Sequence, residues 1–264
     1  MSETPLNGSV RYQAQGALAI IELDRPAALN ALDADMSRQF LAAVRAATSA
    51  ATTRAVLLCG AGRAFCAGGD VAGMQSGGTT AVAEELIENL HESVRLLTAH
   101  DAPVIAALQG AVAGAGWSLA MAADLAIAAD DAVFTLAYGR LGASCDVGSS
   151  WALPRIVGLR RALQIALLSE RIDAATALQW GLVNRLVPAA QLREQALALA
   201  QQLADGPTLA LGRLKRLMRQ SLDTELGPQL DAERDAFIAG TASADFAEGV
   251  SAFLAKRPPR FVGR

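Results

Sequence analysis

The alternation of strand-like and helix-like segments along the chain predicts an α/β fold. Three short apolar runs are typical of buried strands: 17–23, 55–59 and 103–108. Each run is followed by a segment with the periodicity of an amphipathic or buried helix: 33–50, with Asp33 as the expected N-cap, 81–99 and 114–122. Two more short strands are predicted at 125–128 and 132–136.

From residue 159 onward, helical patterns dominate. Six helices are predicted there, interrupted by one strand at 182–187: 159–168, 173–180, 189–204, 207–221, 224–239 and 243–255. Gly206–Pro207 marks a boundary between residues 1–205, which form the α/β core, and residues 206–264, which form a helical region. The apolar stripes of these last helices need a surface to cover, either their own core or another subunit.

The composition excludes several classes of protein. With 264 residues, 52% hydrophobic and 19% charged, the chain is long and apolar enough for a large buried core. The net charge is −3 and no basic stripe is interleaved with aromatics, so nucleic-acid binding is not expected. No apolar run is long enough to span a bilayer, and Met1–Pro5 does not resemble a signal peptide, so we expect a cytoplasmic protein. The three cysteines lack the spacing of a zinc site or a disulfide framework, and no metal is expected.

Two glycine-rich turns, Gly62–Asp70 and Gly110–Gly116, each follow a predicted strand and lead towards a helix. Small residues in such a turn let a ligand approach the main chain closely and reach its N–H groups. Two turns of this kind in one domain can place two N–H donors on a single oxygen. That arrangement is an oxyanion hole, and it suits chemistry on a carbonyl group.

Other motifs in this region are incomplete. Gly114–Leu119 lacks the third glycine of a dinucleotide fingerprint. Gly116–Ala120 approaches a nucleophile elbow around Ser118, but both histidines lie upstream of it, in the wrong order for a catalytic triad. His91 and His100 are expected to be surface residues, because they lie on or just after the charged helix 81–99.

Asp146 lies among small and apolar residues, in a turn that contains glycine. A carboxylate in an apolar pocket has a raised pKa and can carry a proton between carbons. The same pattern is also typical of a helix N-cap or a turn acid.

The two turns, together with Asp24–Leu32 and Trp180–Asn184, resemble the crotonase (enoyl-CoA hydratase/isomerase) superfamily over nearly the whole chain. The resemblance implies a spiral of ββα units with a helical C-terminal region that forms homotrimers or homohexamers. It also implies an acyl-CoA thioester whose carbonyl lies between the backbone N–H groups of Gly69 and Ala115. Coenzyme A then enters as part of the substrate, and no separate cofactor is implied.

The resemblance also implies substrate-binding residues along both turns and the 25–29 segment, where the adenine is expected. They are Arg25, Ala27, Leu29, Ala64, Cys66, Ala67, Gly68, Asp70, Gly114 and Tyr138. Arg25 or Arg63 is a candidate partner for the phosphates. Five residues are candidates for an apolar cavity, and equally for ordinary core: Met74, Leu86, Leu90, Trp117 and Tyr138.

The chain departs from the hydratases of this family, which use two glutamates. Alignment without gaps places Ser118 and Tyr138 at those positions, and neither is a carboxylate base. Asp146 falls where some isomerases carry their acid, and residues 146–155 and 247–257 resemble the phenylacetate-pathway ring-epoxide isomerase branch. The aromatic acyl-CoA dehalogenases are similar at the same place, with a nucleophilic aspartate where Asp146 falls and a basic histidine where His91 falls.

We therefore expect an acyl-CoA isomerase that moves a double bond or rearranges a ring epoxide, with Asp146 as the proton shuttle. Three alternatives stay open. They are enoyl-CoA hydration in fatty-acid or aromatic-acid degradation, with Asp146 activating water; hydrolysis or dehalogenation, with Asp146 as nucleophile and His91 as base; and acyl-CoA binding without catalysis.

Overall fold

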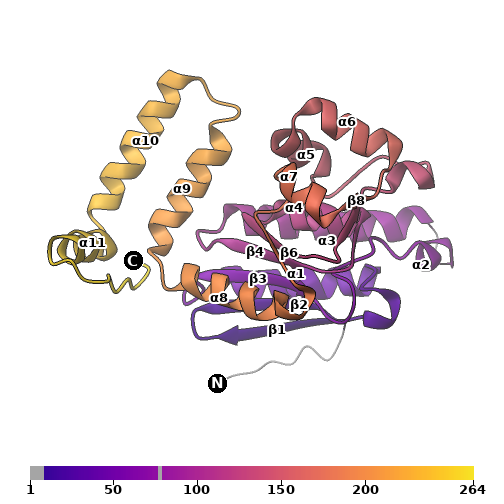
Figure 1. Cartoon of the computed structure of the whole chain (residues 1–264), viewed down its shortest axis with the longest axis horizontal. Helices are drawn as coiled ribbons and strands as arrows, with labels where there is room; N and C mark the ends of the chain where they lie inside the picture. The colour runs from indigo at the N-terminus through magenta and orange to yellow at the C-terminus, as the bar shows by residue number, and fades with distance from the viewer. Residues whose placement is uncertain (1–8, 77–78) are drawn as a thin grey trace.

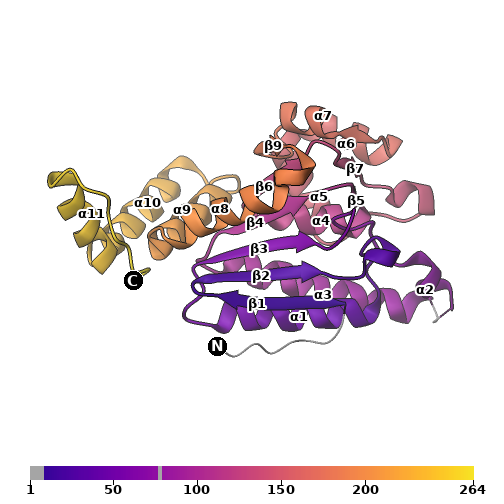
Figure 2. The ribbon, with the colours of Figure 1, turned by 60° about the horizontal axis from the view of Figure 1, so that its bottom comes forward.

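A computed structural model describes residues 9–76 and 79–264 of the chain. Its main sheet has six strands in the order β1-β2-β3-β4-β6-β9 (Figure 2). The strands are β1 (Val10–Gln15), β2 (Leu18–Leu23), β3 (Ala55–Gly60), β4 (Val104–Leu108), β6 (Leu125–Ala129) and β9 (Arg185–Val187). Within this six-stranded sheet, the β1–β2 pair is antiparallel and the other neighbouring strands are parallel.

A smaller sheet contains β5 (Ala111–Ala113), β7 (Val133–Thr135) and β8 (Ile172–Asp173). The chain passes from the large sheet to the small one twice in the same way, from β4 to β5 and from β6 to β7, before it enters a helix. Cys66 extends the small sheet by a bridge to Val112, and Gly69 forms a bridge to Leu32. This repeated passage is the predicted ββα spiral, and it confirms the predicted fold class.

Helices cover both faces of the large sheet, so the inner strands β2, β3 and β4 are buried on both sides. On β2, Ala19, Ile21 and Leu23 belong to the core beneath α1 (Ala34–Ser49) and α3 (Thr79–Ala99). Leu18 and Ile20 face the opposite way and pack in the core beneath α8 (Leu192–Ala204). Asp33 caps α1 as predicted, because its side chain accepts a hydrogen bond from the N–H of Met36.

Five further helices complete the core: α2 (Val71–Ser76), α4 (Gly114–Ala122), α5 (Ser149–Val157), α6 (Leu159–Leu168) and α7 (Ala174–Gln179). The predicted strands and helices are present, with boundaries that differ by a few residues. Residues 189–191 form a separate 3₁₀ turn, and α8 begins at Leu192. Strands β1, β5 and β8 were not predicted. Two of these have three residues or fewer, too short for a pattern of alternation.

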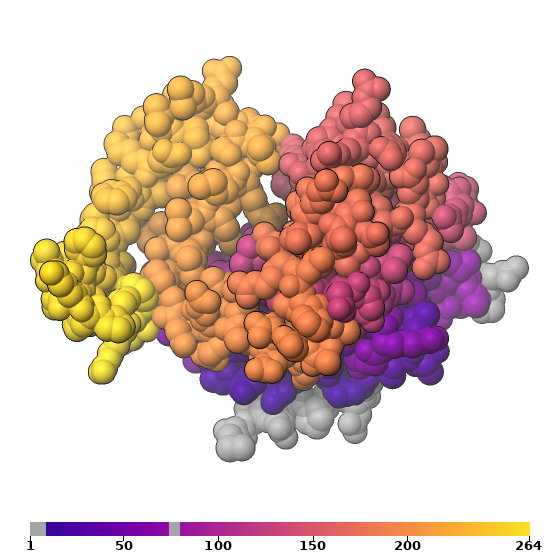
Figure 3. Space-filling view, viewed as in Figure 1, coloured from indigo at the N-terminus to yellow at the C-terminus, as the bar shows by residue number. Residues whose placement is uncertain are grey.

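The last three helices, α9 (Thr208–Gln220), α10 (Leu226–Thr241) and α11 (Ala244–Leu254), extend away from the core (Figure 1). Large apolar side chains are exposed on these helices and on the turn between α9 and α10: Leu214, Met218, Leu222, Leu226, Leu230, Phe237, Ile238, Val250, Phe253 and Leu254. A groove lined by Trp151, Ile156, Met218 and Leu222 separates α9 from α5, where the space-filling view is hollowed (Figure 3). Among the described residues, no helix is long and apolar enough to cross a membrane. Met1–Pro5, which prompted the expectation that no signal peptide is present, lies outside the described residues.

Candidate active site

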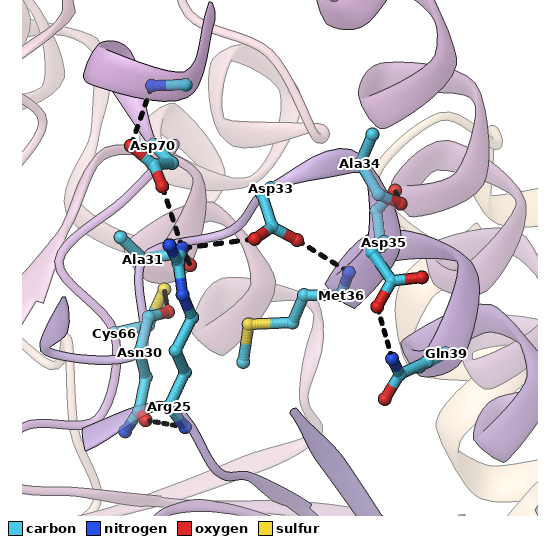
Figure 4. Close-up of polar contacts among 12 residues, drawn as sticks. Arg25, Asn30, Ala31, Asp33, Ala34, Asp35, Met36, Gln39, Cys66 and Asp70 are labelled. Carbon is cyan, nitrogen blue, oxygen red and sulfur yellow. Dashed lines mark hydrogen bonds and ion pairs between the residues drawn. The ribbon is translucent and has the colours of Figure 1, made fainter. Parts of the chain in front are cut away.

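The first glycine turn is built around the side chain of Asn30, which is buried and also accepts a hydrogen bond from the N–H of Arg25 (Figure 4). Its amide nitrogen donates hydrogen bonds to three carbonyl oxygens of the turn, those of Ala61 (2.9 Å), Ala64 (2.8 Å) and Phe65 (3.1 Å). Asn30 itself has a φ of 57°, a left-handed conformation that asparagine adopts more readily than most residues. The segment that resembles the family therefore acts as the scaffold of the turn.

Leu32 holds the backbone on both sides of Gly69. Its N–H donates to the carbonyl of Gly68 (2.8 Å), and its carbonyl accepts from the N–H of Asp70 (2.8 Å). In a parallel bridge of this kind, the N–H of the central residue points away from the partner strand. The N–H of Gly69 therefore faces away from Leu32.

The second turn packs directly against the first. A Cβ atom on Gly116 would lie 2.5 Å from the Cβ of Cys66, so only glycine lets helix α4 approach this closely. A Cβ on Gly68, whose φ is +107°, would lie 3.6 Å from the Cα of Gly114. The two turns, predicted separately from sequence, are thus neighbours in space.

The N–H of Ala115 lies in the first turn of α4, where helix N–H groups have no partner within the helix. Within residues 9–76 and 79–264, no hydrogen bond uses the N–H of either Ala115 or Gly69. Two free backbone donors therefore lie on adjacent turns, a disposition suited to binding one carbonyl oxygen.

Arg25 is held by two carboxylates beside the first turn (Figure 4). One guanidinium nitrogen lies 2.8 Å from Asp70 and 3.2 Å from Asp33. Asp70 also accepts from the N–H of Gly73 at the start of α2, and this bond, together with Arg25, lowers the pKa of Asp70. The charge of Arg25 is thus balanced within the protein. Arg63 is exposed, as is Ala27.

The remaining predicted binding residues surround these turns. Ala64, Cys66, Gly68 and Gly114 are buried, whereas Ala67 and Leu29 are partly exposed. The thiol of Cys66 donates to the carbonyl of Asn30 (3.1 Å), and burial raises its pKa to about 12. Cys66 is therefore a packing residue and not a reactive thiol.

Asp146 lies between the 3₁₀ helix Tyr138–Leu141 and the start of α5. Its carboxylate accepts a hydrogen bond from the hydroxyl of Tyr138. Burial raises the pKa of Asp146, while the bond from Tyr138 and the nearby His91 partly oppose that shift. Burial and the negative charge of Asp146 raise the pKa of Tyr138 in turn. Asp146 is not a helix cap, because Gly148 occupies the N-cap position of α5.

Ser118 joins this pair from helix α4. Its Oγ lies 3.1 Å from the Tyr138 hydroxyl oxygen and 3.2 Å from the carbonyl oxygen of Gly114. From the sequence, Ser118 and Tyr138 were predicted to stand at the positions of the two glutamates of the hydratases. In the structure both residues lie close to Asp146. Their mutual contact is a tertiary feature without a signal in the sequence, because Ser118 and Asp146 belong to different elements.

The expectation that both histidines are surface residues is wrong. The Nε2 of His91 accepts a hydrogen bond from the N–H of Val147 (3.2 Å), next to Asp146. Val147 has a φ of 50°, which is strained for a β-branched residue. The signal was present in the sequence, since His91 lies four residues after Ile87 and three before Val94, at the edge of the buried face of α3. His100 is also partly buried, its Nδ1 accepts from the N–H of Ala102 (3.0 Å), and burial lowers its pKa.

Three of the candidates for an apolar cavity are core residues. Leu86, Leu90 and Trp117 are each at most 1% exposed, and Trp117 packs against Phe134 with ring centres 5.6 Å apart. The side chain of Met74 lies outside the described residues.

The ββα spiral, with its two glycine turns side by side, defines a protein of the crotonase fold. The sequence profile described as enoyl-CoA hydratase/isomerase matches residues 13–264, and the chain belongs to this family.

Known relatives carry both functional names. A Rhodobacter capsulatus protein called "probable enoyl-CoA hydratase" is 41% identical over 97% of this chain and 98% of its own length. The 1,2-epoxyphenylacetyl-CoA isomerase of Escherichia coli K12 is 40% identical over 92% of this chain and 94% of its own length. The crystal structure of an enoyl-CoA hydratase from Polaromonas sp. JS666 has a TM-score of 0.91 and 35% identity, covering 97% of this chain and all of that one.

Proposed function

We propose that the protein is an acyl-CoA isomerase with Asp146 as its single acid–base group. The observation that carries the proposal is the setting of Asp146. Its carboxylate is partly buried and bonded to Tyr138, and burial raises its pKa. Ser118 and Tyr138, which hold the positions of the two hydratase glutamates, supply hydroxyl groups and no second carboxylate.

The proposed reaction is a 1,3-proton shift. Asp146 removes a proton from a carbon of the acyl chain, and the C–H electron pair moves into an enolate whose charge lies on the thioester oxygen. The N–H groups of Gly69 and Ala115 donate to that oxygen, each contributing roughly 3–4 kcal/mol to transition-state stabilisation. Asp146 then returns the proton to the second carbon, which leaves the double bond displaced and the atoms unchanged.

Binding of the thioester is proposed at the two turns, by Arg25, Ala27, Leu29, Ala64, Cys66, Ala67, Gly68, Asp70, Gly114 and Tyr138. Because Asp33 and Asp70 balance the charge of Arg25, Arg63 is the freer partner for the phosphates. The name of the Escherichia coli relative supports a ring epoxide of an aromatic acid as one substrate, and hence a place in phenylacetate catabolism.

Hydration of an enoyl-CoA is the second candidate, supported by the name of the Rhodobacter capsulatus relative. In that reaction Asp146 activates a water molecule. Dehalogenation or hydrolysis has less support, because the Nε2 of His91 already accepts a hydrogen bond from Val147. Acyl-CoA binding without catalysis also has less support, because it gives no role to the raised pKa of Asp146.

We further propose a cytoplasmic homotrimer or homohexamer formed through residues 206–264. The support is the row of exposed apolar side chains on α9, α10 and α11, which a monomer leaves in water.

The test offers 2-enoyl-CoA and 3-enoyl-CoA in deuterated water, followed by the ring epoxide of phenylacetyl-CoA. Movement of the double bond with deuterium uptake, without added water, supports isomerisation. Loss of that activity in Asp146→Asn, but not in the matched control Asp173→Asn at the exposed cap of α7, assigns it to Asp146. Formation of 3-hydroxyacyl-CoA as the main product would establish hydration instead.

A further inference from the structure

Three contacts in the site link Asp146 to the backbone of the second turn. Asp146 contacts the Tyr138 hydroxyl, Tyr138 contacts Ser118, and Ser118 contacts the carbonyl oxygen of Gly114. That carbonyl belongs to the same peptide unit as the N–H of Ala115. The chain of contacts therefore runs from the proposed base to one of the two proposed oxyanion donors.

The number of hydroxyl protons limits how many of these contacts are hydrogen bonds at one time. Ser118 and Tyr138 each bring a single hydroxyl proton, and an ionised carboxylate brings none. Two protons must then serve three contacts. Tyr138 donates to the charged Asp146, and the single proton of Ser118 is divided between the Tyr138 oxygen (3.1 Å) and the Gly114 carbonyl oxygen (3.2 Å).

Protonation of Asp146 supplies the third proton. Asp146 then donates to Tyr138, Tyr138 donates to Ser118, and Ser118 donates to the carbonyl of Gly114. A bond to that carbonyl polarises its peptide unit and makes the N–H of Ala115 a stronger donor.

We propose that Ser118 is a positioning residue that strengthens the Ala115 N–H when Asp146 gains a proton. The inference rests on the proposed function, in which Asp146 holds the substrate proton while the thioester oxygen carries negative charge. The oxyanion donor is then strongest at the step that needs it. No proton is transferred along these contacts: the Tyr138 and Ser118 hydroxyls rotate, so that each donates one hydrogen bond and accepts one, and Asp146 keeps the substrate proton for its return.

The carbonyl stretch of a bound thioester measures the strength of its hydrogen-bond donors. The probe is butyryl-CoA labelled with ¹³C at the thioester carbonyl, bound to the full-length protein, with infrared spectra recorded as the pH is lowered through the titration of Asp146. In the wild type, the band is expected to move to lower frequency as Asp146 becomes protonated. In Ser118→Ala, and in Tyr138→Phe, which breaks the relay at its middle, the movement is expected to be smaller.

Ser93→Ala is the matched control. Ser93 is fully buried, and its hydroxyl donates to the carbonyl four residues earlier, that of Asn89, as Ser118 reaches Gly114. It lies on α3, and among the hydrogen bonds of the described residues none joins it to Tyr138. This variant is expected to keep the wild-type band movement. Equal movement in Ser118→Ala and Ser93→Ala would overturn the proposal, because the loss of the Asp146 charge alone would then explain the shift.

Kinetics give a second readout. Ser118→Ala is expected to lower kcat about threefold to tenfold, the effect of one hydrogen bond, with little change in KM because the Ser118 side chain is buried. Failure of the relay and failure of the proposed function are separable. If Asp146→Asn keeps wild-type deuterium exchange, the proposed function is wrong; if exchange is lost and Ser118→Ala behaves as Ser93→Ala, only the relay is wrong.

Discussion

Asp124 and Asp146 are both largely shielded from water, but their partners are opposite in kind. Asp124 contacts two cations, with Lys215 Nζ at 3.0 Å and an Arg219 nitrogen at 2.9 Å, and it accepts from the N–H of Val104 at 2.9 Å. Asp146 accepts from the hydroxyl of Tyr138, and among the described residues no lysine or arginine forms an ion pair with it.

This difference in partners indicates a different role for each carboxylate. The pair of cations comes from α9, so Asp124 tethers the C-terminal helices to the core. Lys215 is itself buried, which lowers its pKa, and the charge of Asp124 opposes that shift. Asp146 has burial without a lysine or arginine partner, and its pKa is raised. A carboxylate of the first kind holds structure together, and one of the second kind is suited to exchanging protons.

The largest effect that tests this contrast is on catalysis. Asp146→Asn is expected to lower kcat/KM about a thousandfold, ~4 kcal/mol in barrier, because general acid–base catalysis is lost. Unfolding in urea should show no loss of stability, because no lysine or arginine loses a partner. An inactive variant that is also strongly destabilised would contradict the contrast.

Asp124→Ala is expected to lower stability without changing substrate binding. Removing the counter-charge of buried Lys215 and of Arg219 should lower the free energy of unfolding by about 3–5 kcal/mol. The folded fraction should keep the wild-type KM. The control is Asp231→Ala, which breaks an exposed pair with Arg234 and should change stability little. Equal urea midpoints for the two variants would show that Asp124 is not a tether.

Because the pKa of Asp146 is raised, both activity and stability should depend on pH through this residue. Catalysis needs the ionised base, so kcat/KM should fall as pH falls through a value above the ordinary 3.8. The contribution of Asp146 to the free energy of unfolding changes with pH in the opposite direction to kcat/KM. The folded protein favours protonated Asp146, so this contribution is full below the ordinary pKa and is lost as pH rises through the raised one. Urea titrations of wild type and Asp146→Asn should therefore diverge in favour of the variant as pH rises.

Tyr138→Phe provides the matched change. The hydrogen bond from Tyr138 lowers the pKa of Asp146, so its removal should move the acid limb of kcat/KM to higher pH, by roughly 0.5–1 unit. An acid limb that stays in place or moves to lower pH would show that Tyr138 does not stabilise the ionised carboxylate.

The smallest effect concerns His91, which holds the strained turn beside Asp146. His91→Leu leaves the buried N–H of Val147 without an acceptor and should cost about 1–2 kcal/mol of stability together with part of kcat. His91→Gln keeps an acceptor and should recover part of both. Identical behaviour of the two variants in urea unfolding and in kcat would show that the bond to Val147 has no positioning role.

Much of the fold was predictable because its signals are local. The apolar run of β2, the Asp33 cap and the stripes of α1 and α3 each depend on residues within one element. The spiral order of the strands came from the family resemblance, since periodicity does not say which strands are neighbours. The short strands β5 and β8 were not predicted, because two or three residues are too few to show the alternation of apolar and polar residues that indicates a strand.

For the site, the sequence by itself determined the two glycine turns and the apolar setting of Asp146. Only the tertiary structure decided that Asn30 builds the first turn, that Arg25 is held by Asp33 and Asp70, and that Ser118, Tyr138 and His91 converge around Asp146. The physical reason is that conformational preferences act over a few neighbouring residues. Hydrogen bonds between distant side chains, and the pKa shifts that follow from them, exist only once packing has brought those residues together.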